Sequence, residues 1–520
     1  MSSELESRTM PVTAADSTGM NARARWGVYL LLIAIAIGNM SGRLLSVNST
    51  DKLQLETAKL REGIERQRKQ LIREGVTEAE LEARLSLDVE RLREELRLQR
   101  PFLSANDRSR WMTIRSLAER GTYEIDAIVG QPTWDTIDMV QHKGADGKLH
   151  LYSSKPPLLI VLLAGEYWAI NKATGWTLAD NPYEVGRLML FTVQVLPTIL
   201  MLAIIASLAE RFGRTDWGRI FVVAAAAFGT MLTPFVAVLN NHTIAAVSAA
   251  VALYAFVRIW FDDSRQWRWY ALAGLAGAFT AANELPALAF FALLSAAVLW
   301  KNWRLAAAGF APLALLVLAA SFGTNYWAHD SWRPPYAHRS ATDPEDNWYH
   351  YSYELGGKER KSYWLDPQGI DKGEPSKLDY ALHCFVGHHG IFSLTPVWLL
   401  SAWGAWLWLR GGTTGERQLA AGIALLTVVV LTFYIGLRPQ IDRNYGGMTS
   451  GLRWLFWLAP LWLLVMLPAA DRMAQCRRGM SLALVLLAFS VLSASYPTWN
   501  PWIQPWIYNW LQSCGWRGFS

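Results

Sequence analysis

The chain alternates between long apolar stretches and shorter polar segments. Three of the apolar stretches contain no Asp, Glu, Lys, Arg or His, namely Phe221–Leu239, Leu305–Trp327 and Leu419–Leu437. Each is close to the roughly 20 residues that an α-helix needs to cross the hydrocarbon core of a bilayer. They are apolar on every face, whereas a surface helix of a soluble protein is apolar on one face only. The pattern predicts an all-α polytopic membrane protein.

Basic residues in the loops decide how the chain is threaded. Clusters of Lys and Arg in short loops stay on the cytoplasmic side of a membrane. The run Pro156–Ile170 starts with two prolines and contains Glu166, and all the clusters fall inside only if this run does not cross. We therefore expect it to form a helix in the outer interface. The clusters lie at 211–219, 258–268, 301–304, 410–417 and 472–478.

This threading predicts about eleven transmembrane helices. A cytoplasmic tail, 1–25, precedes a first helix that acts as a signal anchor, and an extracytoplasmic tail, 497–520, ends the chain. Helices 2–7 fall within 187–327 and helices 8–11 within 391–496. The expected crossings are 26–45, 187–209, 218–239, 243–261, 268–283, 286–301, 304–327, 391–410, 418–437, 453–470 and 480–496.

The insertion 46–100 differs from the rest, because it is rich in Leu, Glu, Arg and Lys. Its leucines and isoleucines recur at roughly helical spacing until Gly75-Val76-Thr77, and Thr77 with Glu80 makes a capping box for a second helix. The pattern predicts a helical hairpin outside the membrane. A structural or partner-binding role and a plain solvated spacer both remain open for it.

Composition agrees with the membrane reading. Hydrophobic residues make up 52% of the chain and charged residues 18%, against about 25% in soluble domains. The net charge of +6 gathers in short loops, a pattern of membrane topology rather than of nucleic-acid binding. The three cysteines have no metal spacing, although Cys384 and Cys514 could pair in an oxidising compartment. No phosphate-binding glycine motif for a soluble nucleotide is present.

The threading brings the conspicuous polar residues to the extracytoplasmic side. The first extracytoplasmic loop, 101–186, carries Asp107, Arg110 and Lys155. A carboxylate can act as a general base toward a hydroxyl group, while Arg and Lys can hold a phosphate and stabilise its charge as it leaves. Further candidates for substrate or phosphate binding follow in later outer loops, including the large loop 328–390: Asn241, His242, Glu284, His388, His389, Tyr445 and Arg453.

The first of these loops resembles a known superfamily. Asp107-Arg-Ser-Arg110-Trp111, a helix, Gly121-Thr-Tyr123 and then Lys155-Pro-Pro-Leu is similar to the C-type (GT-C) membrane glycosyltransferases, in the branch of protein mannosyltransferases and lipid A aminoarabinose transferases. The resemblance implies a polyprenyl-phosphate sugar donor and inverting transfer. It makes Asp107 the catalytic aspartate, and Arg110 and Lys155 the cations that bind the donor phosphate. The chain departs from the family's Asp-Glu pair, because Arg108 replaces the glutamate.

Structural readings stand beside these roles. Asp107 could cap a helix, Arg110 and Lys155 could reach toward lipid headgroups, and Arg453 could anchor to headgroups or hold a phosphate. Asn241, His242 and Glu284 could serve a tight turn and a cap. The pair His388–His389 suits a sugar contact or structure better than a metal, so a divalent cation stays open as a cofactor. Trp111, Trp134 and Trp348 are the outer-loop candidates for stacking on a sugar.

The function expected is therefore transfer of a sugar from a polyprenyl-phosphate donor to a hydroxyl of a lipid, polysaccharide or protein, at the outer face of a bacterial inner membrane. A ligase that moves whole glycans from a lipid diphosphate is chemically close. Two other classes remain as alternatives. One is a transporter or flippase of a lipid-linked substrate, and the other is a non-catalytic scaffold of envelope assembly.

Overall fold

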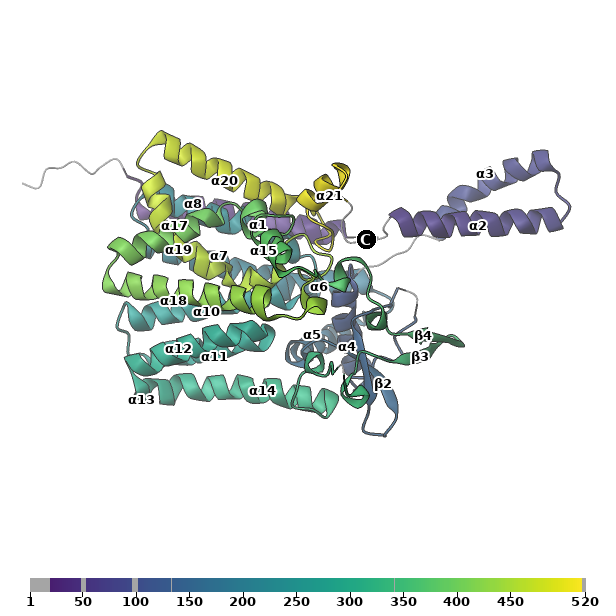
Figure 1. The fold of residues 1–520 in the computed structure, drawn as a ribbon, viewed down its shortest axis with the longest axis horizontal. Helices are drawn as coiled ribbons and strands as arrows, with labels where there is room; N and C mark the ends of the chain where they lie inside the picture. Colours follow the sequence, from purple (N-terminus) through teal and green to yellow (C-terminus); the bar gives the residue numbers. More distant parts are fainter. Residues whose placement is uncertain (1–18, 48–52, 96–101, 132, 341, 517–520) are drawn as a thin grey trace, which may run out of the picture.

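The computed structural model describes residues 19–47, 53–95, 102–131, 133–340 and 342–516. The fold is mostly helical (Figure 1). The helices before residue 213 are α1 (Ala22–Ser46), α2 (Leu53–Arg73), α3 (Glu78–Glu95), α4 (Ala105–Arg120), α5 (Pro157–Thr174), α6 (Pro182–Leu190) and α7 (Leu196–Phe212). Those of the middle are α8 (Asp216–Phe228), α9 (Leu232–Phe235), α10 (Asn241–Trp260), α11 (Trp267–Asn283), α12 (Leu288–Lys301), α13 (Trp303–Leu305) and α14 (Ala311–His329). The remaining helices are α15 (Lys377–Phe385), α16 (Ile391–Leu394), α17 (Trp398–Gly411), α18 (Thr414–Leu431), α19 (Ala459–Met473), α20 (Arg477–Ser495) and α21 (Trp506–Ser513).

The expectation of a helical membrane protein is confirmed to the following extent. In the described part of the chain, eight helices are long and apolar enough to cross a membrane. Short 3-10 or π-helical turns join neighbouring α-helices within several of them. The eight candidate membrane-spanning helices are Ala22–Ser46, Pro182–Phe212, Asp216–Phe235, Asn241–Trp260, Trp303–His329, Thr414–Leu437, Arg453–Met473 and Arg477–Ser495. Each corresponds to one expected crossing.

The other three expected crossings are shorter. Helix α11 has 17 residues, and an apolar helix continues through the 3-10 turn before α12 to span Leu285–Lys301. The expected crossing 391–410 is broken, because Thr395-Pro396 separates the single turn α16 from α17, which has 14 residues. Proline has no N–H for the helix ladder and disfavours helical geometry in the residue before it. The count of eleven therefore stays a prediction.

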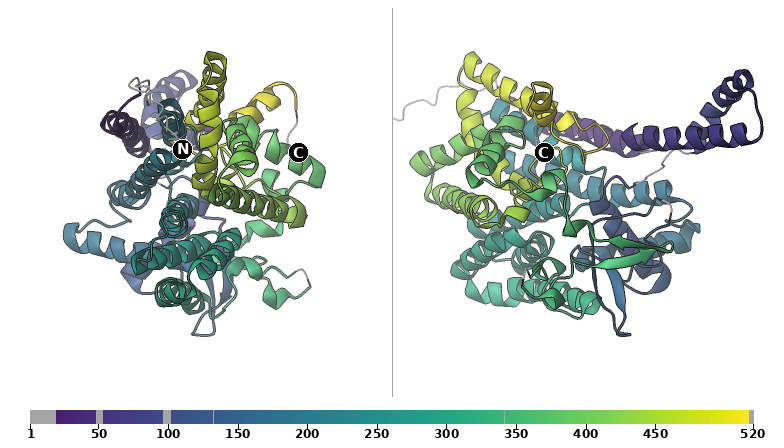
Figure 2. Two further views of the ribbon diagram at one scale, coloured as in Figure 1. Left: turned by 90° about the vertical axis from the view of Figure 1, so that its left-hand side faces the viewer. Right: turned by 45° about the vertical axis from the view of Figure 1, so that its right-hand side comes forward.

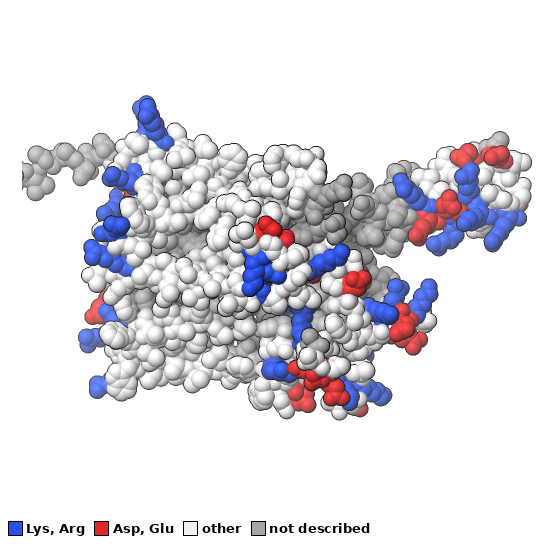
Figure 3. Space-filling model, viewed as in Figure 1, with Lys and Arg blue, Asp and Glu red and all other residues white. Residues whose placement is uncertain are grey.

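The long helices pack side by side as a bundle, seen lengthwise in Figure 1 and nearly end-on in Figure 2. Helix α19 is the most deeply buried and packs against α7, α8, α10 and α17. An uncharged surface separates two charged ends (Figure 3). The basic end carries the five Lys and Arg clusters of the short loops, where Arg211 pairs with Asp262 and Lys301 with Asp263.

The opposite end, here the site end, carries α4, α5 and two small sheets that the prediction of an all-α fold did not include (Figure 1). Strands β1 (Met139–Lys143) and β2 (Leu149–Ser153) pair antiparallel, with Met139 opposite Ser153. Strands β3 (Ser352–Leu355) and β4 (Lys358–Lys361) form the second hairpin. Helix α5 is the helix that was expected at Pro156–Ile170, and it is not among the helices long and apolar enough to cross.

A stack of rings ties the large loop 328–390 to the β1–β2 hairpin. The rings of His142 and Tyr152 are parallel, with their centroids 4.0 Å apart. The ring of Trp348 lies 4.3 Å from that of His142 and is stacked on that of His338 at 3.6 Å. The Gln141 N–H also donates to the Trp348 carbonyl at 3.0 Å. Trp348 is thus engaged in packing between two loop segments.

The expected helical hairpin is present as α2 and α3, which project beyond the site end (Figure 1). Thr77 precedes α3, and its hydroxyl donates to Glu80 at 3.3 Å. A small apolar core of Leu71, Leu81 and Leu85 holds the two helices together near their connection. All three cysteines are free thiols, so the open pairing of Cys384 with Cys514 is not formed.

Candidate functional site

The N-terminus of α4 fixes the position of Asp107. Ser104 is the N-cap, and its hydroxyl accepts the N–H of Asp107 at 3.2 Å. Asp107 closes a capping box by accepting the Ser104 N–H at its Oδ1, at 2.9 Å. The side chain is buried, and burial raises the pKa of Asp107 to about 6 against the lowering effect of Arg108. Asp107 therefore caps the helix and also has a carboxyl group with a raised pKa.

Arg108 stands where the superfamily that the chain resembles carries a glutamate, and its side chain makes two hydrogen bonds to neighbouring loops. Its Nε donates to the Asp135 carbonyl at 2.6 Å and its Nη1 to the Phe102 carbonyl at 2.9 Å. Its side chain therefore ties α4 to the preceding and following loops. These contacts give Arg108 a structural position at the place where the family carries a glutamate.

Arg110, on the first turns of α4, begins a polar chain that crosses to the membrane helices. Its Nη2 donates to Asn241 Oδ1 at 2.5 Å, and Asn241 Nδ2 donates to Glu284 Oε1 at 2.8 Å. The same carboxylate oxygen of Glu284 contacts His242 Nδ1, and the other ring nitrogen of His242 lies 2.9 Å from Arg453 Nη1. Five of the sequence candidates are thus joined in one chain, in which Arg110, His242 and Glu284 are buried and Asn241 and Arg453 are half-buried.

Short element ends hold this chain in place. Asn240 caps α10, so that Asn241 and His242 occupy its first turn, and Glu284 directly follows the last residue of α11. Arg453 begins the 3-10 helix Arg453–Leu458, which leads into α19. The chain therefore joins α4 to three elements at the site end of the bundle.

Lys155 has a partner that sequence reasoning missed. Its Nζ lies 2.9 Å from Asp138 Oδ1, and the two side chains are 15% and 16% exposed. Burial alone would raise the pKa of Asp138, but Lys155, Arg453 and Arg110 bring it below its ordinary value. These three cations are therefore within electrostatic reach of one carboxylate.

The cations also act on one another. Burial, together with the charge of Arg453, lowers the pKa of Arg110 to about 10. Burial also lowers the pKa of Lys155 to about 8, although Asp138 opposes this change. Both groups carry a positive charge at pH 7. The carboxylates of Asp107, Asp138 and Glu284 act on Arg110 in the opposite direction, so the cations and carboxylates form one mixed cluster.

A second cluster contains the remaining sequence candidates. His388 Nδ1 lies 2.5 Å from His389 Nδ1, and the ring of Tyr445 is stacked on that of His389 at 5.0 Å. Burial lowers the pKa of His388 to about 2 and that of His389 to about 3, so both rings are neutral. The two clusters meet at Gly446, the residue after Tyr445. The Gly446 carbonyl accepts from Arg453 Nε at 2.9 Å.

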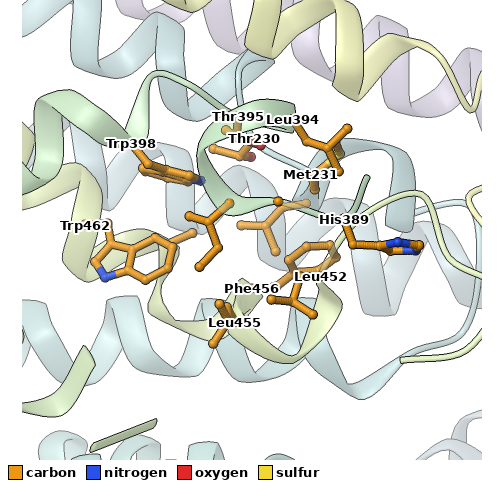
Figure 4. A pocket seen from close by; sticks show the side chains of 15 residues that line it. Thr230, Met231, His389, Leu394, Thr395, Trp398, Leu452, Leu455, Phe456 and Trp462 are labelled. Carbon is orange, nitrogen blue, oxygen red and sulfur yellow. The ribbon is translucent and has the colours of Figure 1, made fainter. Parts of the chain in front are cut away.

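His389 borders a small cavity of about 40 Å³. In Figure 4 it lies at one end, with Trp398 and Trp462 at the other. A larger cavity of about 410 Å³ lies between α10, α12 and α18, and its lining is apolar apart from Gln418. No candidate residue of the polar chain lines this larger cavity.

A divalent cation would need a group of His, Cys, Asp or Glu side chains that lie close together. Within the described residues, the one group of three His, Cys, Asp or Glu side chains whose ligand atoms lie within 4.8 Å of one another is Glu124, Asp126 and His150. None of these belongs to the polar chain. The pair His388–His389 is not part of such a group.

The tryptophans named for sugar stacking have internal partners. Trp111 is fully buried and stacks on Phe102 at 4.6 Å, and Trp134 packs against the same ring at 5.4 Å. Together with Trp348, which is stacked between two histidine-bearing segments, they stabilise the site end instead of offering a free face.

Asp138 could have been found from the sequence. Asp146-Gly147 is a turn dipeptide followed by the alternating Leu149-His150-Leu151, a pattern that favours a β-hairpin, and Gly147 has a φ of +76°. Pairing the flanking strands places the residue before β1 beside the residues that follow β2. That step brings Asp138 next to Lys155.

No known protein-family model matches this chain, and no curated protein matches it.

Proposed function

We propose that this protein is an integral membrane glycosyltransferase that moves a sugar from a polyprenyl-phosphate donor to a hydroxyl acceptor with inversion. The observation that carries the proposal is the convergence of Arg110, Lys155 and Arg453 around Asp138 at one end of a membrane bundle. Arg110 shares α4 with Asp107, whereas Arg453 comes from the 3-10 helix before α19. A buried Arg110 with half-buried Lys155 and Arg453 suits a phosphate that is attached to a lipid, and the carboxylate suits a hydroxyl nucleophile.

Each residue then has a chemical role. Asp107 takes the proton of the acceptor hydroxyl, whose oxygen attacks the anomeric carbon of the sugar. The bond from that carbon to the phosphate oxygen breaks, and its electron pair stays on the polyprenyl phosphate. Arg110, Lys155 and Arg453 stabilise the charge that this oxygen gains. Asn241, His242 and Glu284 keep the two arginines in position.

The proposed orientation follows from charge. The basic end of the bundle fits the cytoplasmic side, so that the site end faces outward. Donor, acceptor and catalytic groups then meet at the outer face, in a bacterial inner membrane. The acceptor, whether lipid, polysaccharide or protein, approaches from that side.

The test is an assay of purified protein with polyprenyl-phosphate sugars in detergent and in vesicles. We expect release of polyprenyl phosphate in the wild type and a loss of at least about 10²-fold in Lys155→Ala, which removes a charge that stabilises the leaving group. Lys148→Ala removes an exposed lysine from the same hairpin and serves as the matched control. Movement of intact lipid-linked sugar between leaflets without cleavage would instead favour a flippase.

The pH dependence tests the roles of Asp107 and Lys155 together. The carboxylate must be deprotonated to accept a proton, and its pKa is about 6; the lysine must be protonated, and its pKa is about 8. We therefore expect kcat/KM to rise tenfold per pH unit up to about pH 6 and to fall above about pH 8. In Lys155→Arg the alkaline limb should move to higher pH. A profile without an acidic limb near pH 6 would argue against Asp107 as the base.

A further inference from the structure

The ion pair of Lys155 and Asp138 lies largely out of contact with solvent, because the two side chains are 15% and 16% exposed. A largely buried ammonium group needs a counter-charge, and Asp138 supplies it at 2.9 Å. The same carboxylate is within electrostatic reach of Arg110 and Arg453. In the ligand-free protein, a carboxylate thus stands among the cations that would receive a phosphate.

The backbone around Asp138 is fixed on both sides. Its carbonyl accepts from the hydroxyl of Ser109 on α4 at 2.6 Å, and from the Ser154 N–H at 3.3 Å. The hydroxyls of Ser109 and Ser153 lie 2.6 Å apart, and Ser153 also accepts the Lys155 N–H at 3.2 Å. The two partners of the ion pair are therefore anchored to the same hairpin and to α4, while only their side chains can exchange partners.

We propose that Asp138 is an internal counter-anion that competes with the donor phosphate for Lys155 and so limits how tightly the site holds the polyprenyl phosphate that is released. This inference rests on the proposed function, because it takes the ligand to be a polyprenyl phosphate. It assigns Asp138 as a positioning residue that acts through Lys155, and not as a group that exchanges protons with the substrate.

The reaction itself makes such a competitor useful. The donor phosphate is a diester with one negative charge. Cleavage of the sugar–oxygen bond converts it to a monoester, which carries about 1.5 to 2 negative charges at pH 7. The product would therefore bind the three cations more tightly than the donor. Asp138 offsets this gain, because it repels the extra charge and pairs again with Lys155 as the product leaves.

Binding of polyprenyl monophosphate without sugar tests the inference apart from catalysis. We expect Asp138→Asn to bind it about tenfold more tightly than the wild type, within the range of coupling between neighbouring charges. Asp138→Glu, which keeps the charge, should stay close to the wild type. Asp135→Asn neutralises a nearby carboxylate that is 60% exposed and is the matched control. Asp138→Ser repeats the neutral substitution with a different side chain.

A double variant separates competition from a general loosening of the site. In Lys155→Ala, replacement of Asp138 by Asn should increase the affinity clearly less than it does in the wild type, because the shared partner is gone and only the repulsion between Asp138 and the phosphate remains to be relieved. In the transfer assay, Asp138→Asn should also be inhibited by polyprenyl phosphate at about tenfold lower concentration. If the wild type binds polyprenyl phosphate and the neutral variants bind it equally or more weakly, the inference is wrong while the proposed function stands. If the wild type does not bind it, the proposed function and the inference both fail.

Discussion

Replacement of Asp107 by Asn is expected to lower kcat for sugar transfer by about 10²–10⁴-fold, the range that general base catalysis contributes. Asparagine can still accept the Ser104 N–H that Asp107 accepts at 2.9 Å, so the cap of α4 persists. It cannot take a proton from the acceptor hydroxyl. The loss should therefore appear in kcat, measured as release of polyprenyl phosphate, with little change in the affinity for the donor.

Two comparisons show whether that loss is chemical. Asp135→Asn changes a carboxylate that is mostly exposed, and it should retain near wild-type turnover. The thermal unfolding curve of Asp107→Asn should overlap that of the wild type, because the cap is kept. Full transfer by a folded Asp107→Asn protein would remove this residue from the mechanism. A large fall in stability would show instead that Asp107 acts mainly as a cap.

The sequence identified the residues of the polar chain as candidates, but it did not predict the hydrogen bonds between them. Arg110, Asn241 and Glu284 were singled out because charged and amide groups at helix ends near a membrane surface are costly without a function. Their hydrogen bonds depend on how α4, α10 and α11 are rotated against one another. Hydrophobic periodicity does not determine that rotation for helices that are apolar on every face. The hydrogen bonds between these residues are therefore visible only in the three-dimensional structure.

The strands and the ion pair were missed for a different reason. The expectation for 101–186 was a loop with interfacial helices, and no pairing was considered for the segment that includes Met139–Lys143. Without β1 and β2, Asp138 is one carboxylate among several in a loop of 86 positions. Its role depends on the hairpin, which brings it back to Lys155 across 17 positions of sequence. Turn chemistry at Gly147 was the available signal.

Apolar length predicted the long helices correctly where they are unbroken. Eight expected crossings have the length and composition to cross, whereas α17 is shortened by Pro396 and α11 ends at Asn283 beside Glu284. These interruptions lie at or near the site end. Helix ends that stop short leave backbone and polar side chains available to a site, as transporters and channels also show. Apolar length alone could not reveal them.

Replacement of Glu284 by Ala is expected to lower the free energy of unfolding by about 1.5–3 kcal/mol, the usual contribution of hydrogen bonds to a charged group. Glu284 is buried, accepts from Asn241 Nδ2 at 2.8 Å and contacts His242. Without it, His242 loses this partner and Asn241 keeps only the Asn283 carbonyl as an acceptor, so the arginines beyond them are held less firmly. Thermal unfolding in detergent should therefore shift to lower temperature, and the donor affinity should fall.

Glu284→Gln separates the hydrogen bond from the charge. Glutamine can still accept from Asn241 through its carbonyl oxygen, so it should recover much of the stability while the affinity for polyprenyl phosphate changes less than in Glu284→Ala. Glu345→Ala, at an exposed position of the large loop, is the control and should leave the unfolding curve unchanged. Wild-type stability in Glu284→Ala would show that Asn241 and His242 hold the two arginines without this carboxylate. The chain from Arg110 to Arg453 would then be a set of separate contacts, and the support it gives to a shared phosphate site would be lost.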